Sequence, residues 1–256
     1  MAIKDGGFEY KFGNDKIKDG TIVYNMGPAH GCPSAKLDLC PIAGQKCYAF
    51  RDETTYRHNT LPYRQRQEIY WLGNPAEVFV EKIMKALDHK EKTAAKAKIK
   101  HDKAVAAGNA KPGFLPFKRV VRWNESGDFH SLACIDKLKT IAELTPQVTH
   151  YIYTHRTDLI EHLVSHPKNL VVQISVSSME DSVKYNAMGF NTFFTDTTIS
   201  IKGRTKKLIE GLPAHDWAMK TLKTKYGPSA QVCRWECHKC ALCKINHSRT
   251  IHICLH

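Results

Sequence analysis

Val148-Thr-His-Tyr-Ile-Tyr-Thr154 and Leu170-Val-Val-Gln-Ile-Ser-Val176 are two short runs rich in β-branched and aromatic residues, and residues 158–164 between them have helical spacing. The second run is almost continuously apolar, which is typical of a strand that is buried on both faces. Strands of this kind that are separated by helices form parallel βαβ units. This stretch therefore predicts an α/β fold with a parallel sheet.

The same alternation extends in both directions along the chain. Further strands are expected at 21–24, 117–123 and 192–195, and helices at 75–89, 131–144, 179–188 and 213–226. The chain of 256 residues contains no internal repeat and no clear linker between domains. We predict a single α/β domain over residues 1–256, built as a partial (β/α) barrel-like parallel sheet with a cysteine-rich C-terminal metal-binding tail.

Polar turns follow the expected strands, at the sheet edge where ligands of α/β proteins bind. Residues 124–128 read Asn-Glu-Ser-Gly-Asp. Gly127 permits a close approach of backbone to a ligand, and Glu125 and Asp128 are able to accept bonds from an ammonium or ribose group or to bind a hard cation. The pair His155-Arg156 is a candidate clamp for a carboxylate or phosphate. For any one of these turns taken alone, an ordinary helix cap is the simpler explanation.

Seven of the nine cysteines form two groups, one near each end of the chain. The first group is Cys32, Cys40 and Cys47, and the second is Cys233, Cys237, Cys240 and Cys243. Closely spaced thiolates bind zinc or an iron–sulfur cluster. The Cys-x2-Cys-x2-Cys run of the second group favours a cluster, with Cys233 as the fourth ligand. Zinc and a group of inert thiols remain the alternatives.

The formal net charge of +13 makes nucleic acid a plausible partner. A lysine-rich insertion at about 90–111 is explained either by contacts with phosphates or by a solvated helix. No apolar run is long enough to cross a bilayer, and the N-terminus lacks the apolar segment of a secretion signal. We therefore expect no membrane partner and a reducing, cytoplasmic location, where cysteines bind metal more readily than they form disulfides.

Several short motifs carry a resemblance to a known family. These are Cys32-Pro33, Cys47-Tyr48-Ala49, Val121–Phe129, Tyr151–Arg156 and the C-terminal cysteine group, and in this order they resemble the bacteriophage "gene product 88"-like proteins. The resemblance spans about residues 21–243. That family is in turn distantly similar to radical S-adenosylmethionine (SAM) enzymes, which have a partial (β/α) barrel, three cysteines after the first strand and a Gly-Gly-Glu-type turn after the second.

The resemblance implies particular ligands. Cys32, Cys40 and Cys47 would hold a 4Fe–4S cluster, and the turn of Ser126, Gly127 and Asp128, next to Glu125, would meet the methionine end of SAM. The cysteines at 233–243 would hold an auxiliary cluster or complete the first one. A phage origin would place the protein in the host cytoplasm.

Three functions follow from these residues. The first is an iron–sulfur enzyme, radical-SAM-like, that acts on a nucleic acid or nucleotide. The second is a metal-stapled nucleic-acid-binding protein without catalysis. The third is a divalent-metal nuclease that uses Glu125, Asp128 and His130. In the first two, both cysteine groups are expected to lie close together, because the last helix of a barrel returns next to the first strand.

Overall fold

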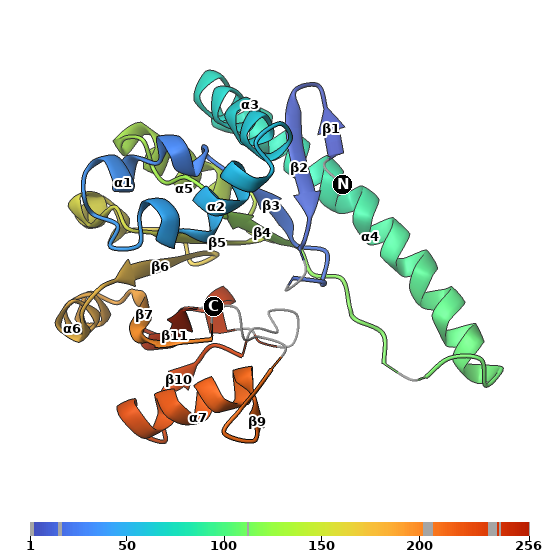
Figure 1. The fold of residues 1–256 in the computed structure, drawn as a ribbon. Coiled ribbons are helices and arrows are strands. Elements are labelled where there is room, and N and C mark those ends of the chain that lie inside the picture. The colour runs from blue at the N-terminus through green and yellow to red at the C-terminus, as the bar shows by residue number, and fades with distance from the viewer. Residues whose placement is uncertain are drawn as a thin grey trace.

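The computed structural model describes residues 3–14, 17–111, 113–201, 207–234, 240 and 242–255. Within this part of the chain, nine strands form one sheet in the order β1-β2-β3-β4-β5-β6-β7-β11-β10 (Figure 1). They are β1 (Ile3–Asp5), β2 (Phe8–Phe12), β3 (Ile22–Tyr24), β4 (Val120–Trp123), β5 (Thr149–Thr154), β6 (Leu170–Val176), β7 (Asn191–Ser200), β10 (Gln231–Val232) and β11 (Thr250–Leu255). A separate small hairpin consists of β8 (Leu208–Ile209) and β9 (Leu212–Pro213).

The middle of the sheet is parallel and follows the order of the chain. In the order of the sheet, strands β3, β4, β5, β6, β7, β11 and β10 pair in parallel, and within this nine-stranded sheet of the described residues only the β1–β2 and β2–β3 pairs are antiparallel. From β3 to β7 each crossover moves one step in the same direction, as in a (β/α) barrel. After β7 the chain passes to the edge strand β10 and then returns to place β11 between β7 and β10, so that β1 and β10 lie at opposite edges of the sheet. The prediction of a mixed α/β fold with a mostly parallel sheet is confirmed.

One face of the sheet, here called the outer face, packs against helices that include α3 (Thr60–Gly73), α4 (Ala76–Ala106) and α5 (Leu132–Leu144). The other helices are α1 (Pro33–Lys36), α2 (Tyr48–Thr55), α6 (Met179–Ala187) and α7 (Ala214–Tyr226), and the 3-10 turns are η1 (Ala29–Gly31), η2 (Gly44–Lys46), η3 (Thr157–Leu163) and η4 (Leu242–Lys244). Trp123 of β4 and Ile152 of β5 join Trp71 of α3, Phe79 of α4 and Ile135 of α5 in one buried core. This core fixes the strands whose ends carry the polar turns.

The opposite, inner face carries every second residue of the same strands, because side chains alternate across a strand. Arg122 of β4 is level with Tyr151 of β5, and Tyr153 of β5 is level with Gln173 of β6. The segment around η4 covers part of this face, and Gln173 donates a hydrogen bond to the carbonyl oxygen of Cys243 at 3.4 Å.

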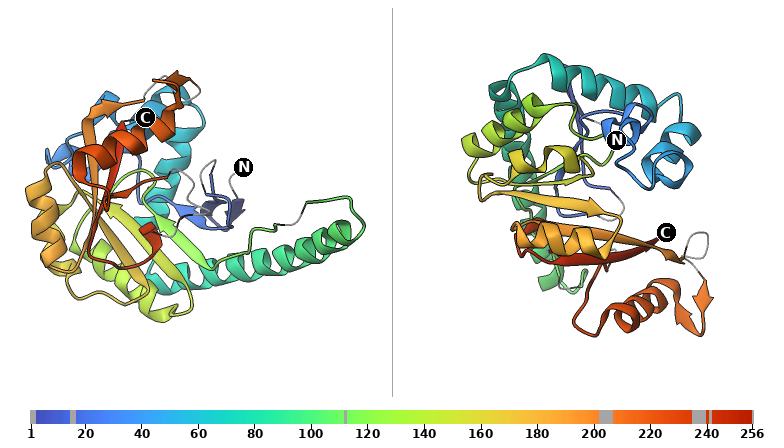
Figure 2. Two further views of the ribbon diagram at one scale, coloured as in Figure 1. Left: turned by 90° about the horizontal axis from the view of Figure 1, so that it is seen from below. Right: turned by 90° about the vertical axis from the view of Figure 1, so that its left-hand side faces the viewer.

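The lysine-rich insertion is a continuation of a helix. We expected a helix to end near residue 89, but α4 runs on to Ala106 and its second half projects from the body of the protein (Figures 1 and 2). Lysine and alanine have high helix propensity, so nothing stops the helix before Gly108, whose φ is +73°. Within the described residues, no helix is both long and apolar enough to cross a membrane.

The second cysteine group is not a terminal tail. It lies between β10 and β11, so the chain returns to the sheet after the cysteines and adds β11 beside β7. We did not predict β11 or the β1–β2 hairpin. The cysteine segment is thereby held at both of its ends by strands of the main sheet.

Candidate functional site

The first cysteine group lies in the connection from β3 to α2. Cys32 precedes α1, Cys47 precedes α2, and both are half-buried free thiols. The pKa of Cys40 is raised to about 12, mainly by burial and further by the nearby Cys32 and Cys47. The three thiols therefore share one electrostatic environment, which also includes Asp128.

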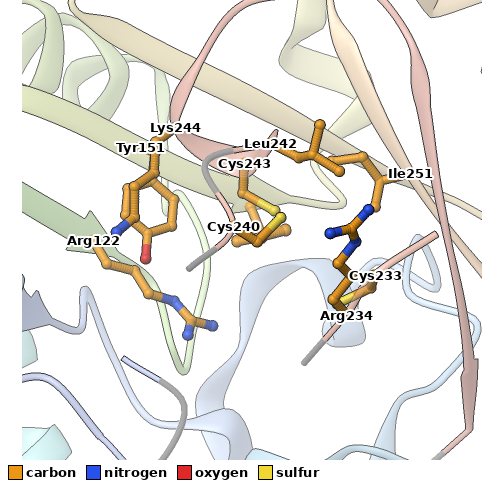
Figure 3. Close-up of a pocket in the computed structure, with 10 residues that line it drawn as sticks. Arg122, Tyr151, Cys233, Arg234, Cys240, Leu242, Cys243, Lys244 and Ile251 are labelled. Atoms are coloured by element: carbon orange, nitrogen blue, oxygen red, sulfur yellow. The ribbon is translucent and has the colours of Figure 1, made fainter. Parts of the chain in front are cut away.

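The second cysteine group lies at the inner face. Cys233, Cys240 and Cys243 line one cavity, and Figure 3 shows the side chains of Cys240 and Cys243 directed toward each other. Cys237, which we also predicted as a ligand, lies outside the described residues. The three described cysteines of this group therefore lie along the same cavity, and their role as metal ligands stays a prediction.

Three side chains connect the two groups. Tyr48, which follows Cys47, donates its hydroxyl to the carbonyl of Glu125 at 2.6 Å and lies 3.4 Å from Arg122 Nη2. The Arg122 guanidinium lies over the ring of Tyr153, at 5.4 Å from its centroid. Burial raises the pKa of the Tyr153 hydroxyl, and the adjoining Cys243 raises it further.

The groups approach each other by a different route from the one we expected. Helix α7 packs against β7 and β11, far from β3 in the strand order, so it does not return next to the first parallel strand. The η4 segment crosses the inner face instead, and Lys244 forms an ion pair with Asp19, three residues before β3. An open sheet leaves room for this crossing, which a closed barrel would not.

The thiols that the structure describes are not arranged as a coordination sphere. Among the described residues, no three His, Cys, Asp or Glu side chains are grouped closely enough to hold a metal ion. The expected metal-binding character of the 233–243 segment therefore has no support from the arrangement of these side chains.

The turn after β4 is held by a network of hydrogen bonds centred on Asp128. Asp128 Oδ1 accepts bonds from Thr154 Oγ1 at 2.6 Å and Phe129 N at 2.8 Å. Its Oδ2 accepts bonds from Ser34 Oγ at 2.6 Å and His155 N at 2.8 Å. Asp128 is buried and joins the cysteine loop to the ends of β4 and β5. Both of its oxygens are occupied by protein donors.

Ser126 and Gly127 are engaged in the same way. The Ser126 N–H donates to Asn25 Oδ1 at 2.8 Å, and its hydroxyl donates to Glu53 Oε1 at 2.9 Å. Gly127 has a φ of +78°, and a Cβ atom there would lie 2.6 Å from the carbonyl oxygen of Gly27. The missing side chain accommodates Gly27, so Gly127 is required by the fold whether or not a ligand approaches it.

Glu125 is a buried carboxylate with its own partners. Lys11 Nζ lies 2.7 Å from its Oε2, and Asn14 donates to its Oε1 at 2.5 Å. Burial alone would raise the pKa of Glu125, but Arg122, Lys11 and Asn14 lower it from 4.5 to about 2. Glu125 is consequently ionised in the folded protein and anchors residues 11–14 to the turn.

We expect the stability of the protein to reflect this lowered pKa. A carboxylate with a depressed folded-state pKa contributes its full stabilisation above the unfolded-state pKa and loses it as the pH falls through the folded-state value. The contribution of Glu125 should therefore disappear between about pH 5 and pH 2, with a total of about 3 kcal/mol. Urea unfolding of the parent and of Glu125→Gln at pH 7 and pH 3 measures the difference, and an identical pH dependence for both proteins would contradict the assignment.

Glu53 of α2 is a central residue that we did not predict. Fully buried, it accepts bonds from Ala29 N at 2.7 Å and His30 N at 3.0 Å, and it pairs with Arg64 at 2.8 Å. Although burial by itself would raise its pKa, the bonds from Ala29, His30 and Arg64 keep the pKa of Glu53 below its ordinary value. Its sequence context of polar residues gives no signal of burial.

The remaining candidates have structural partners. Arg156 forms a two-pronged pair with Asp158, with both contacts at 2.8 Å, and donates to the carbonyl of Phe129. The guanidinium of Arg156 is therefore occupied by protein groups, contrary to the expectation that Arg156 would bind a carboxylate or phosphate together with His155. His130 Nε2 lies 3.1 Å from the carbonyl oxygen of Met26 and 3.3 Å from Glu68. The described residues offer no metal site that combines His130 with Glu125 and Asp128.

The fold and this site define an α/β protein with an open, mostly parallel sheet and two cysteine groups joined through its inner face. The family model described as Gene product 88 matches residues 8–246. The chain belongs to the gene product 88 family, as the order of its motifs predicted. No curated protein and no solved structure matches it.

Proposed function

We propose that this protein is an iron–sulfur protein of phage type in which the two cysteine groups bind one or two 4Fe–4S clusters, with zinc as the alternative metal. The observation that carries the proposal is that thiols from distant parts of the sequence lie near one another. A series of contacts leads from Cys47 through the neighbouring Tyr48 to Arg122, from Arg122 to Tyr153, and from Tyr153 to Cys243. Thiolate sulfur is the ligand that such clusters require. Among the described residues no three possible ligands are grouped closely enough to hold a metal ion, so metal binding has to bring the described cysteines closer together.

The strand order supports a radical-SAM-like architecture for this proposal. Three cysteines follow the first parallel strand, β3, and a glycine turn follows the second, β4. The side chains at the proposed SAM position do not fit an added ligand, because Glu125, Ser126 and Asp128 are all engaged by protein groups. The proposed cluster does not depend on SAM binding.

Spectroscopy of anaerobically purified protein tests the proposal. A reduced 4Fe–4S cluster is paramagnetic, so we expect a brown protein whose electron paramagnetic resonance signal appears on chemical reduction. A colourless protein that contains zinc and has no such signal would favour the alternative metal. A colourless protein without either metal would contradict metal binding altogether.

The lysine-rich second half of α4 supports a nucleic-acid partner. Such a partner is compatible with an enzyme that acts on nucleic acid and with the alternative, a nucleic-acid-binding protein without catalysis. This arm, residues 90–106, projects from the body (Figure 2). It carries exposed lysines at 92, 96, 98, 100 and 103, while Lys98 is paired with Asp102 at 2.6 Å. A row of cations on a projecting helix is suited to track phosphates.

Neutralising the arm should weaken binding to duplex DNA of any sequence. We expect the variant with glutamine at Lys96, Lys98, Lys100 and Lys103 to flatten the salt dependence, because each phosphate contact contributes about −0.9 to the slope of log K against log salt. The control replaces four exposed lysines elsewhere, Lys168, Lys184, Lys220 and Lys223. Equal slopes for the arm variant and the control would show that the arm is only a solvated helix.

A further inference from the structure

Four lysines of the arm lie along one side of helix α4. Residues that are three or four positions apart are neighbours on the surface of a helix. Lys92, Lys96, Lys100 and Lys103 follow this spacing, and all four are exposed. At about 100° per residue they lie within an arc of about 80°, and they extend over about 17 Å of the helix. We refer to these four residues as the lysine stripe.

The side of the arm opposite the stripe is occupied by contacts within the protein. His101 lies on that side, and its ring centroid is 5.4 Å from that of Phe114, in the segment that returns from the tip of the arm. Lys98 also lies away from the stripe, and it pairs with Asp102 at 2.6 Å. The stripe is therefore the side of the arm that faces away from the returning segment.

The acidic residues of this part of α4 do not neutralise the stripe. Asp88 and Glu91 pair with Arg119, which lies just before β4, and Asp102 pairs with Lys98. The described part of the chain gives none of the stripe lysines a carboxylate within 4.0 Å. Like charges at this spacing repel each other along a helix. A partner that carries a regular row of negative charges relieves this repulsion.

We propose that the lysine stripe binds the sugar–phosphate backbone of duplex DNA, with α4 lying along the surface of the duplex. This proposal rests on the nucleic-acid partner proposed above and specifies its form and the contact surface. A duplex carries one negative charge for about every 1.7 Å of its axis, which suits a row of cations on a straight helix. Lysine contacts phosphates as a point charge and requires no particular geometry.

The composition of the arm favours a duplex over a single strand. Residues 90–106 contain no Phe, Tyr or Trp, the side chains on which unpaired bases stack. They also contain no Arg, Asn or Gln, which are among the side chains that form two hydrogen bonds with one base. The stripe is therefore suited to contact the backbone of a duplex of any sequence.

Two single replacements within the arm test whether the position of a charge matters. Lys96→Gln removes one charge from the stripe, and Lys98→Gln removes one charge from another side of the same helix. Both lysines are exposed, and glutamine has a helix propensity close to that of lysine. The measurement is fluorescence anisotropy of a labelled duplex DNA over a range of salt concentrations. Lys96→Gln should reduce the slope of log K against log salt by about 0.9, and Lys98→Gln should not change it.

A charge-preserving variant completes the test. Lys96→Ala combined with Ala97→Lys keeps the net charge and moves one cation about 100° around the helix, so it should lose the same part of the slope as Lys96→Gln. The parent should also bind the duplex more tightly than one of its single strands. Equal slopes for Lys96→Gln and Lys98→Gln, the parent's slope in the charge-preserving variant, or tighter binding of the single strand would overturn the role of the stripe while leaving a nucleic-acid partner in place. A parent that binds neither probe would overturn the nucleic-acid partner itself.

Discussion

Replacement of Glu53 by alanine is expected to lower the free energy of unfolding by about 3–5 kcal/mol, because it leaves a buried arginine without its anion. Arg64, which is itself buried, donates to Glu53 at 2.8 Å. The same carboxylate also holds the N–H groups of Ala29 and His30 and the hydroxyl of Ser126. Its loss should release the loop before the first cysteine group from the turn after β4. Urea unfolding at pH 7 measures the change.

The matched control is Glu143→Ala. Glu143 is an exposed residue near the end of α5, and its replacement should change the free energy of unfolding by no more than about 0.5 kcal/mol. Glu53→Gln keeps the volume and removes the charge, so its effect should lie between those of the two alanine variants. A loss below about 1 kcal/mol for Glu53→Ala would show that the network around Glu53 is not a main support of the site.

Serine at two cysteines of either group is expected to remove bound metal. Serine oxygen is a poor ligand for iron and zinc compared with thiolate sulfur. The paired replacements are Cys32→Ser with Cys47→Ser, and Cys240→Ser with Cys243→Ser. Loss of all metal in both paired variants would mean one shared site, and loss of a fraction in each would mean two sites. Metal and sulfide content per chain is the measurement.

Cys134 provides the control for this experiment. It is buried on α5 at 4% exposure and belongs to neither cysteine group, so Cys134→Ala should keep the full metal content of the parent. Metal loss in this variant as well would mean that reduced stability, and not ligand removal, explains the result.

The central sheet could be predicted because its strands carry a strong local signal. The limits of β6 were correct to the residue, since an apolar run between turn residues marks a strand that is buried on both faces. The β1–β2 hairpin and β11 were missed. Both mix polar with apolar residues, and β11 pairs with β7, which lies far away in the sequence. A solvated helix was one of the alternatives for the lysine-rich stretch, but its continuity with the preceding helix was missed because the stretch was treated as a separate insertion.

The site could be predicted only as far as its cysteines and its glycine turn. Cysteine spacing is visible in the sequence, whereas a buried network depends on contacts between distant segments. Asp128 bonds to Ser34 and Thr154, which lie 94 and 26 residues away. In the sequence, Glu53 resembles an exposed glutamate of a helix, and its ion pair with Arg64 of α3 is seen only in the folded structure.

Iron and acid-labile sulfide content of the anaerobically purified parent tests the central claim most directly. Binding of a 4Fe–4S cluster predicts iron and sulfide in equal amounts, about four of each per chain for one cluster and about eight for two. Both quantities should fall in the two paired cysteine variants. A parent protein with neither iron nor zinc, or paired variants that keep the full iron and sulfide content of the parent, would contradict the claim that these cysteines bind metal.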